Sequence, residues 1–477
     1  MVHSVLAQVS GISVQRGANN VLESVSATVS QGEIVAVIGE NGSGKSTLIE
    51  SFAGIIPLRE GKVEWTYGSE KIVVRDSEGR RNPPPPMGLT LQNNAICGDE
   101  TVSERLSVAL SVSGIAIENQ RISELLNCWG IGHRSSERVS NLSGGLARRL
   151  AILCGLAPAV MSEIPRVVLL DEPSEGLDES STKVLKGWIK ALSCKGHGIL
   201  IATHDQEISS CADRIITIAD NSLQVSRGAK SGDPIDIPAS APISKRNPVV
   251  SLIRWSFRTE MRNPVDSVGR ATPAIVAILL SYALVGNIDL ESHDSSLLAA
   301  LVLAPGFIVS VSSPAIVSRL EESDSGLWWN AIVGPMARPA YSITAASIFL
   351  PITVSYVSWM IMSTAIDSET SMEVLKWLWV PSLALLDLAI ASTALHIMVA
   401  DLSRSSAAPA SLLLVVLVWP FLELTEALSS IIDNGMTFGL TINDPIPTCL
   451  IASLISALVW LCLLYTSPSP RDLSTCR

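Results

Sequence analysis

The uneven distribution of charge along the chain most constrains its fold. Between residues 271 and 464 the sequence repeatedly continues for 16 or more residues without a charge, whereas residues 1 to about 225 mix charged and apolar positions. The 477-residue chain has a mean hydropathy of +0.38 and only 17% charged residues, which is too apolar for an ordinary soluble protein. We therefore expect two regions, the first in water and the second in lipid.

Composition also excludes some classes of function. The net charge of −11 argues against a nucleic-acid partner, because proteins that bind phosphate backbones usually carry a basic surface. The eight cysteines are scattered without a CxxC pair, so we expect neither a disulfide framework nor a zinc site. The N-terminus lacks the basic and apolar segments of a secretory signal, which predicts that the first region stays in the cytoplasm.

A glycine-rich turn in the first region predicts a nucleotide site. "EIVAVIGENGSGKSTLIESFAG" combines an apolar strand, Ile34 to Ile38, with a GxxxxGK[ST] turn and a helix. In such a turn backbone N–H groups converge on phosphates, Lys45 reaches the β/γ-phosphates and the Ser46 hydroxyl ligates Mg²⁺. The predicted nucleotide-binding residues of this turn are Gly39, Glu40, Asn41, Gly42, Ser43, Gly44, Lys45, Ser46 and Thr47.

Two further apolar strands end in polar side chains. "RVVLLDEP" predicts a buried strand of a parallel sheet, after which Asp171 holds Mg²⁺ and Glu172 orients the attacking water as base. The alternative for these carboxylates is a solvated acidic turn. "GILIATHD" predicts a second buried strand that delivers His204 to the γ-phosphate.

The stretch "NLSGGLARRLAIL" predicts a helix whose N-terminus attracts anions, opened by Leu142, Ser143, Gly144 and Gly145. With the preceding motifs in this order, residues 1 to about 225 resemble the ATPase domain of the ABC transporter superfamily, whose signature is LSGGQ. The resemblance implies an α/β P-loop fold with an α-helical subdomain, and ATP and Mg²⁺ as cofactors. A capping box at Thr101 to Glu104 predicts the first helix of that subdomain.

The same resemblance implies the roles of several residues. Gln92 is the Q-loop residue, a Mg²⁺ ligand that links the site to the membrane domain, and Asp178 belongs to the D-loop. It also implies a homodimer, in which Ser143 of one chain closes on ATP held by Lys45 of the other. The site residues so assigned are catalytic Glu172, His204, Gln92 and Asp178, and metal-binding Ser46, Gln92 and Asp171.

The chain departs from the family pattern at two positions. Leu146 replaces the signature glutamine, which removes a side-chain hydrogen bond but leaves the backbone donors, so ATPase activity should survive. The usual adenine-stacking aromatic is absent from "SVQRGANN". Arg16 either stacks its guanidinium on the base instead or is a solvated loop arginine.

Composition shifts divide the chain into successive parts. We expect an ATPase domain over residues 1–226, a flexible or extended linker over 227–248, and an interfacial amphipathic helix over 249–270. An all-α transmembrane domain of six helices follows over 271–461. Residues 462–477 are either a sequencing-adapter artefact, which we favour, or a short polar tail. The predicted spans are 271–288, 297–317, 340–362, 377–400, 407–422 and 446–460 onward.

Charge between the spans predicts their orientation. Basic residues concentrate in the segments placed inside, whereas Lys376 is the one basic residue predicted outside, which indicates a multi-pass inner-membrane protein with a cytoplasmic ATPase. The polar stretch Arg319 to Pro339, "RLEESDSGLWWNAIVGPMARP", then lies inside between spans two and three. We expect it to contact the ATPase near Gln92 and couple it to the spans. Alternatively it is a solvated loop anchored at the membrane surface by Trp328 and Trp329.

The membrane half resembles the membrane subunit of the haem exporter of cytochrome c maturation, here fused to its ATPase subunit. The likeness rests on six spans, on Asp324 to Leu327 after span two, and on "LSRSSAAPASLLLVVLVWP" entering span five. It implies an ATP-driven exporter of a small or amphipathic molecule, with haem as one candidate and cytochrome c maturation proteins as partners. The rival is a membrane ATPase that loads or releases an extracytoplasmic partner. Asp387 in span four either lines a substrate path, pairs across the dimer or makes a structural hydrogen bond.

Overall fold

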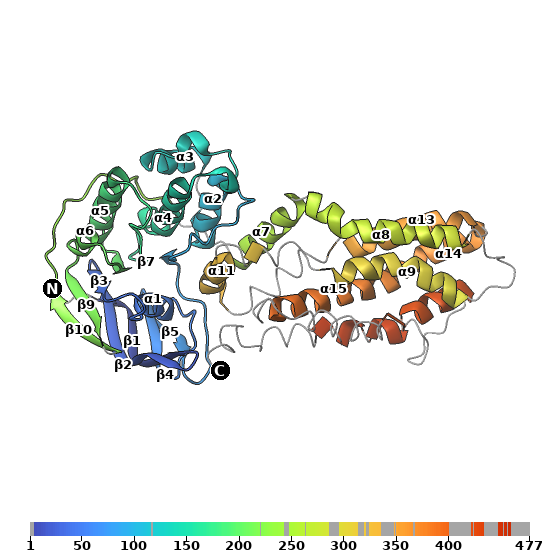
Figure 1. Ribbon diagram of the computed structural model, residues 1–477, viewed down its shortest axis with the longest axis horizontal. Helices are drawn as coiled ribbons and strands as arrows, with labels where there is room; N and C mark the ends of the chain where they lie inside the picture. Colours follow the sequence, from blue (N-terminus) through green and yellow to red (C-terminus); the bar gives the residue numbers. More distant parts are fainter. Residues whose placement is uncertain are drawn as a thin grey trace. The chain divides into compact units, whose positions relative to one another are not determined.

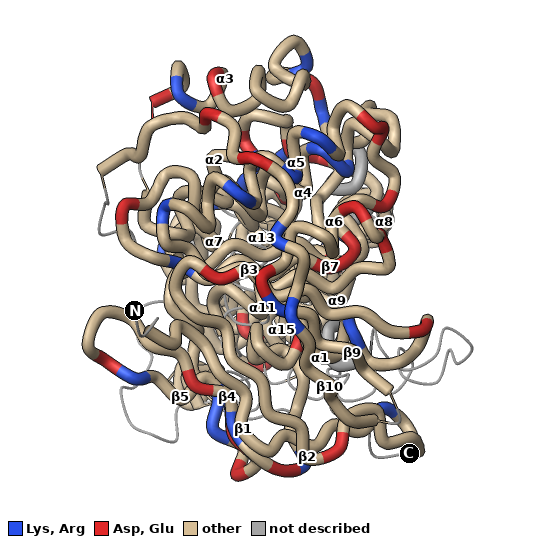
Figure 2. Tube along the Cα trace, turned by 90° about the vertical axis from the view of Figure 1, so that its left-hand side faces the viewer, with Lys and Arg blue, Asp and Glu red and all other residues tan. Residues whose placement is uncertain are grey.

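The computed structural model of the protein is shown in Figure 1. In the first half of the chain, charged residues of both signs occur along strands and helices, as expected of a domain in water (Figure 2). The structure describes residues 4–115, 118–219, 221–242, 248–262, 264–285, 295–312, 319–320, 324–334, 348, 350–365, 368–399, 421–422, 424–433, 447–451, 453–455 and 457–458.

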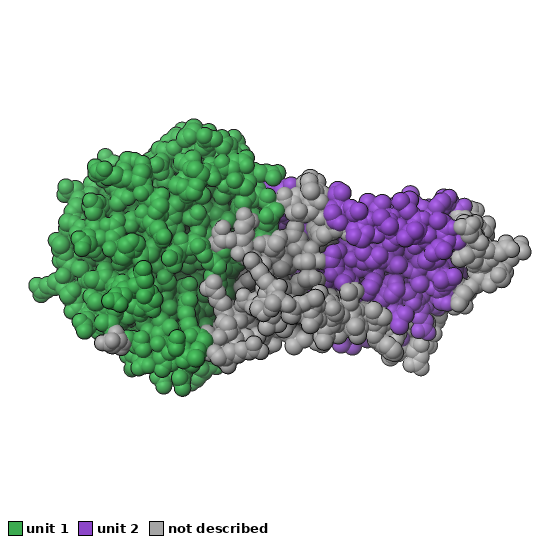
Figure 3. Space-filling view, in the orientation of Figure 1, with its two compact units in different colours: residues 1–255, 319–338, 468–477 green, residues 256–318, 339–467 purple. Residues whose placement is uncertain are grey.

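The chain divides into two compact units (Figure 3). Unit 1 comprises residues 1–255, 319–338 and 468–477, and unit 2 comprises 256–318 and 339–467. Unit 1 therefore includes the polar stretch that the sequence places between two apolar spans.

The described residues of unit 1 form two sheets. The first is antiparallel, in the order β2-β1-β4-β5, and the second has the order β10-β9-β3-β8-β7-β6, with all neighbours parallel except β10 and β9. Every residue of β7 and β8 is buried, as expected of apolar strands in a parallel sheet. The strands are β1 (Val5–Arg16), β2 (Asn19–Ser30), β3 (Ile34–Ile38), β4 (Glu60–Tyr67), β5 (Glu70–Asp76), β6 (Gly88–Thr90), β7 (Val167–Asp171), β8 (Gly198–Ala202), β9 (Arg214–Ala219) and β10 (Ser222–Arg227).

The helices of unit 1 pack against its sheets and against one another. α1 contacts strands of both sheets, and α2, α3 and α4 pack together as a helical subdomain (Figure 1). The predicted capping box is confirmed, since Thr101 and Glu104 cap α2 reciprocally. The helices are α1 (Lys45–Phe52), α2 (Val102–Val112), α3 (Asn119–Cys128), α4 (Gly144–Val160), α5 (Glu179–Cys194), α6 (Gln206–Ser209), α11 (Ser325–Val333) and the short 3-10 turns η1 (Gly132–Arg134) and η2 (Val139–Asn141).

The stretch after β10 is extended and bonded to unit 1. The Ile235 N–H donates to the Gly187 carbonyl at 3.4 Å, and the Ala241 N–H donates to the Met161 carbonyl at 3.0 Å. These contacts favour the extended form of the predicted linker over the flexible one.

The predicted amphipathic helix is shorter than expected. α7 (Pro248–Arg262) ends eight residues before position 270, and α8 (Pro264–Val285) begins at a proline, a residue favoured in the first turn of a helix. In α7, Leu252 and Trp255 are buried and Phe257 is exposed.

Unit 2 is helical. α9 (Ser295–Val311) packs against α8, α13 (Leu350–Met362) and α15 (Trp379–Val399). Residues of α9, α13 and α15 contribute to one apolar core. The turn η5 (Ser363–Ala365) and α14 (Ser368–Trp377) connect α13 to α15. Asp387 is buried in α15.

The structure gives partial information on the spans. Among the described residues one stretch, Val374–Thr393, is long and apolar enough to cross a membrane, and three shorter apolar helices cover Ala271–Leu284, Ser295–Val311 and Leu350–Met362. The fifth predicted span lies almost wholly outside the described residues, as does the 462–477 tail. Residues 424–433 are helical, although the sequence placed them in an outside segment. Six spans remain a prediction.

Candidate functional site

The glycine-rich turn lies between β3 and α1, as predicted. Gly44 caps α1 with a φ of 105°, which favours glycine. A Cβ on Gly39 would lie 2.6 Å from the Ser43 hydroxyl and 2.9 Å from the Ile218 carbonyl, so a side chain does not fit there. The Lys45 ammonium donates to the carbonyls of Gly39 and Glu40, both at 3.0 Å. The turn thus forms a backbone cradle around a buried cation at a helix N-terminus, a geometry suited to phosphate.

The carboxylate at the end of β7 is suited to a metal ion. The Asp171 side chain hydrogen-bonds the Ser46 hydroxyl, but its Oδ1 atom is buried and accepts no hydrogen bond from any residue that the structure describes. Burial raises the pKa of Asp171 to about 6, and the hydrogen bond from Ser46 opposes that shift. A buried oxygen with unused lone pairs beside a hydroxyl fits a hard cation such as Mg²⁺.

Glu172 and His204 lie together. The Glu172 carboxylate accepts the backbone N–H of His204 at 3.2 Å, and its Oε2 atom lies 2.8 Å from Nδ1 of the same residue. Glu172 has a φ of 44°, an uncommon conformation for this residue type that its N–H bond to the Ala202 carbonyl, at 2.8 Å, helps to hold. The sheet therefore brings two predicted catalytic side chains, from different strands, to one edge.

Gln92 follows β6, the strand beside β7, so it lies at the same edge as Asp171. Its side chain is exposed, and its carbonyl accepts a hydrogen bond from Arg148 at 3.0 Å. Sequence reasoning missed Arg148. A charged residue on the buried stripe of α4, between Gly144 and Ile152, was the signal that could have found it, because a buried charge needs partners.

The signature residues open α4. The Ser143 hydroxyl accepts the Leu146 N–H at 3.4 Å and so caps its own helix, directly after Leu142. A Cβ on Gly144 would meet no atom within 4 Å, so packing inside the described chain does not require a glycine there. Gly145 follows in the first turn of the helix.

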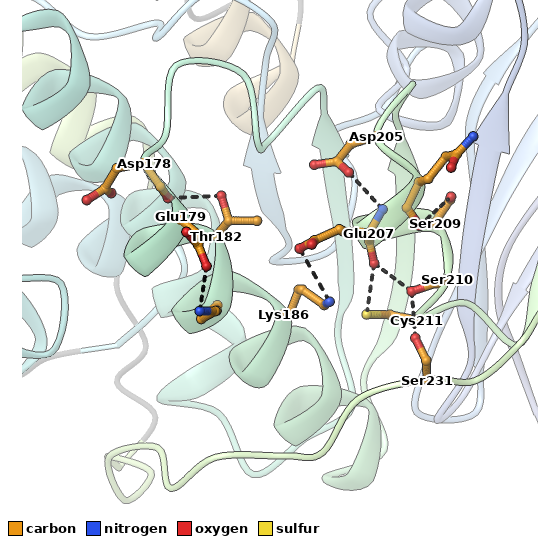
Figure 4. Close-up of polar contacts among 12 residues, drawn as sticks. Asp178, Glu179, Thr182, Lys186, Asp205, Glu207, Ser209, Ser210, Cys211 and Ser231 are labelled. Carbon is orange, nitrogen blue, oxygen red and sulfur yellow. Dashed lines mark hydrogen bonds and ion pairs between the residues drawn. The ribbon is translucent and has the colours of Figure 1, made fainter.

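Asp178 caps α5 (Figure 4). Its carboxylate accepts the Ser181 N–H at 3.2 Å and the Ser180 hydroxyl at 2.7 Å, and forms an ion pair with Arg149 at 2.9 Å. These hydrogen bonds, more than the nearby arginine, hold the pKa of Asp178 well below its usual range. Asp178 therefore joins the start of α5 to the signature helix.

Arg16 is exposed at the end of β1, and its two expected arrangements, stacked on a base or solvated, stay predictions. Its guanidinium forms an ion pair with Glu50 in α1. This pairing limits its freedom to stack on a base.

The expected contact near Gln92 is confirmed. The Asn93 amide donates to the Asp324 carboxylate at 2.6 Å, just before α11. Two further contacts hold the same stretch within unit 1, an ion pair of Arg319 with Asp99 at 2.6 Å and a hydrogen bond from Arg81 to Asn330 at 2.9 Å.

Aromatic side chains extend this contact. The Arg105 guanidinium lies 4.0 Å from the Trp328 ring centroid, and Trp329 packs on Trp255 with centroids 5.2 Å apart. Both tryptophans of α11 are buried in unit 1, which disfavours their use as membrane-surface anchors. Beside them Glu100 is buried 3.8 Å from Arg105, and burial raises the pKa of Glu100 to about 6.

Known proteins match the same region. The family model described as ABC transporter matches residues 22–175. The macrolide export ATP-binding/permease protein MacB of Azoarcus sp. is 31% identical over 55% of this chain and 39% of its own length. The Fe(3+) ions import ATP-binding protein FbpC of Streptomyces coelicolor is 32% identical over 50% of this chain and 66% of its own length.

A third relative is matched over most of its length. The lipoprotein-releasing system ATP-binding protein LolD of Hyphomonas neptunium is 30% identical over 43% of this chain and 90% of its own length. This chain spans only about two fifths of MacB and about two thirds of FbpC. The chain belongs to the ABC transporter family, and its first region is an ATP-binding cassette, an ATPase.

Proposed function

We propose that this chain is one half of an ABC exporter of the inner membrane. Two copies form a homodimer with cytoplasmic cassettes, which bind ATP and Mg²⁺ and use hydrolysis to move a small or amphipathic molecule outward. The observation that carries the proposal is the placement of α11 in the same compact unit as the nucleotide site.

Coupling between the nucleotide site and the apolar half is supported by the short connection from Gln92 to α11. Asn93 is the next residue after Gln92 and bonds directly to Asp324 at 2.6 Å. A shift of Gln92 on nucleotide binding would therefore reach the start of α11 through a single residue, Asn93. The segment has apolar stretches on both sides in sequence, so it is suited to pass that shift to them.

The site geometry supports the proposed roles in hydrolysis. Lys45 and the backbone of the glycine-rich turn would hold the phosphates, while Ser46, Asp171 and Gln92 would hold Mg²⁺. The bound Mg²⁺ would neutralise charge that develops on the phosphates. Glu172 accepts the proton of the attacking water, and His204 holds the Glu172 carboxylate in place from 2.8 Å.

Dimerisation is supported by the open space at Gly144. A glycine that its own chain does not require is expected where an outside group approaches the helix N-terminus closely. In the proposed dimer that group is ATP bound by the partner chain.

Complementation tests the shared site. Chains with Lys45→Ala and chains with Ser143→Arg are each inactive as homodimers, but a mixed dimer retains one intact pair of P-loop and signature. Mixing the two purified variants should restore ATPase activity in detergent. A mixture of Lys45→Ala with Ser46→Ala is the control and should stay inactive, because every site then has a damaged P-loop. Equal inactivity of both mixtures would reject the shared site.

The exporter is favoured over the partner-loading ATPase by one similarity. MacB, by its printed name, combines ATP-binding and permease parts, as this chain combines a cassette with an apolar half. The second candidate is supported by LolD, whose name assigns it to a lipoprotein-releasing system. Inverted vesicles containing the full chain separate the two: ATP-dependent solute accumulation supports export, whereas ATPase activity stimulated only by an extracytoplasmic protein supports loading or release.

A more specific proposal is that the exported molecule is haem. It rests on the resemblance of the membrane half to the haem exporter of cytochrome c maturation. The names of the three relatives refer instead to macrolides, ferric ions and lipoproteins. Haem absorbance inside the vesicles, with the Lys45→Ala chain as control, tests this cargo directly.

A further inference from the structure

Arg148 joins two loops of the nucleotide site. It lies one turn inside α4 and is 5% exposed. Its Nη1 atom donates to the carbonyls of Leu91 and Gln92, both at 3.0 Å. Its Nη2 atom donates to the carbonyls of Asp171 at 3.0 Å and Glu172 at 2.7 Å.

These four carbonyls lie where the sheet ends. The ladder between β6 and β7 runs to the pair Thr90 and Leu170, and the two chains continue from there into the site. Beyond the ladder, buried carbonyls need other donors. The planar fork of an arginine can serve two chains at once, one with each terminal nitrogen, whereas the ammonium of a lysine is a single point.

The buried charge of Arg148 must be stabilised by neighbouring groups. Burial lowers the pKa of Arg148, while the charges of Glu175, Asp171 and Glu172 oppose that shift. Arg166, another buried arginine of unit 1, differs in its surroundings: its guanidinium donates to the Ser113 carbonyl, at 3.1 Å, away from these loops.

We propose that Arg148 is a positioning residue for ATP hydrolysis, which sets the spacing between Gln92 and the carboxylates of Asp171 and Glu172 by holding the backbones of both loops. The inference rests on the proposed roles of those three residues. Because Arg148 lies on the signature helix, it also ties that spacing to α4.

Two substitutions in the full chain test the proposal. Arg148→Lys keeps the charge and loses the fork, and Arg148→Met removes both. We expect each to lower kcat about 100-fold, because displacement of reacting groups by about 1 Å has an effect of this size. The Kd for ATP without Mg²⁺, measured by calorimetry, should change less than about threefold, since Lys45 and its turn are untouched. The tightening of ATP binding by Mg²⁺ should be lost.

Arg166→Met is the matched control for loss of a buried arginine. It should lower the thermal midpoint at least as much as Arg148→Lys does, yet keep kcat and the Mg²⁺ effect. Unchanged kcat and Mg²⁺ effect in Arg148→Lys and Arg148→Met would overturn the proposal. The proposal would also be overturned if Arg148→Lys failed to fold while Arg166→Met folded, because Arg148 would then be required for folding and not for positioning the catalytic groups. If Lys45→Ala hydrolyses ATP normally, the proposed site itself is wrong.

Discussion

The two units differ in how much chemistry their sequences specify. In unit 1, phosphate and metal binding require particular residues at fixed spacings, so Gly39, Lys45 and Asp171 are recognisable before the fold is known. In unit 2 the helices need only be apolar and of sufficient length, and many sequences satisfy that condition. Sequence therefore specifies the ATPase site of unit 1 more closely than the function of unit 2.

The most severe test of this contrast is at Glu172. Glu172→Gln preserves size and removes the proposed base, so kcat should fall about 10³-fold, within the usual range for a general base. ATP binding should persist, because Glu172 is not among the residues proposed to hold the nucleotide. Phosphate release and calorimetry measure the two quantities.

Glu163→Gln serves as its control. Glu163 is exposed, bonds Ser240 and lies outside the site. The turnover of Glu163→Gln should equal that of the unmodified chain. Continued multiple turnover by Glu172→Gln would show that a motif match does not identify the base here.

The second test addresses the boundary between the regions. α11 belongs by sequence to the membrane half and by structure to unit 1, where Trp328 is 3% exposed. Trp328→Ala removes a buried indole and its cation contact with Arg105, a loss of about 3 kcal/mol. Amide hydrogen exchange in α11 should therefore accelerate about 100-fold through local opening.

Trp188→Ala is the matched control, because this indole is equally buried in unit 1 and packs on Trp129. Its loss should leave exchange in α11 unchanged. Equal effects of the two substitutions would mean that α11 responds to general destabilisation and is not held by Trp328.

Some features of the site could be predicted and others could not. The strand Ile34–Ile38 has the predicted bounds, and the strand predicted before the carboxylate pair is β7, because continuous apolar runs before a glycine turn or a carboxylate pair have few other structures. The hydrogen bonds of Arg148 were not predicted. Its partners are backbone carbonyls from two distant segments, and a backbone carbonyl leaves no recognisable pattern of residue types in the sequence.

The helical half was predicted less well for a physical reason. α7 ends where Pro264 begins a new helix. This proline is a local signal, and the amphipathic pattern of the longer stretch gave no indication of the break. The ion pair of Arg16 with Glu50 depends on the packing of β1 against α1, a tertiary contact that the local sequence does not specify.

A smaller effect is expected from Glu100, beside the aromatic contact. Its folded pKa of about 6 exceeds the ordinary 4.5, so the folded state binds the proton more tightly than the unfolded state. Stability from this residue is therefore present below pH 4.5 and lost as the pH rises to 6, by about 2 kcal/mol in all. Thermal unfolding of the full chain and of Glu100→Gln at pH 4.5 and 7 isolates this contribution; an identical pH dependence of the two would contradict it.

The smallest effect is expected where the sequence departs from the signature. Leu146→Gln restores the family side chain, but the Ser143 hydroxyl and the N–H groups of the first turn of α4 are already present. Since those groups are the proposed phosphate contacts, kcat should change less than about threefold. Gly144→Asp is the contrasting variant, because it puts a negative charge where the partner's phosphate is proposed to lie, and it should abolish hydrolysis. A tenfold gain in kcat for Leu146→Gln would show that the missing side chain, and not the helix N-terminus, limits this cassette.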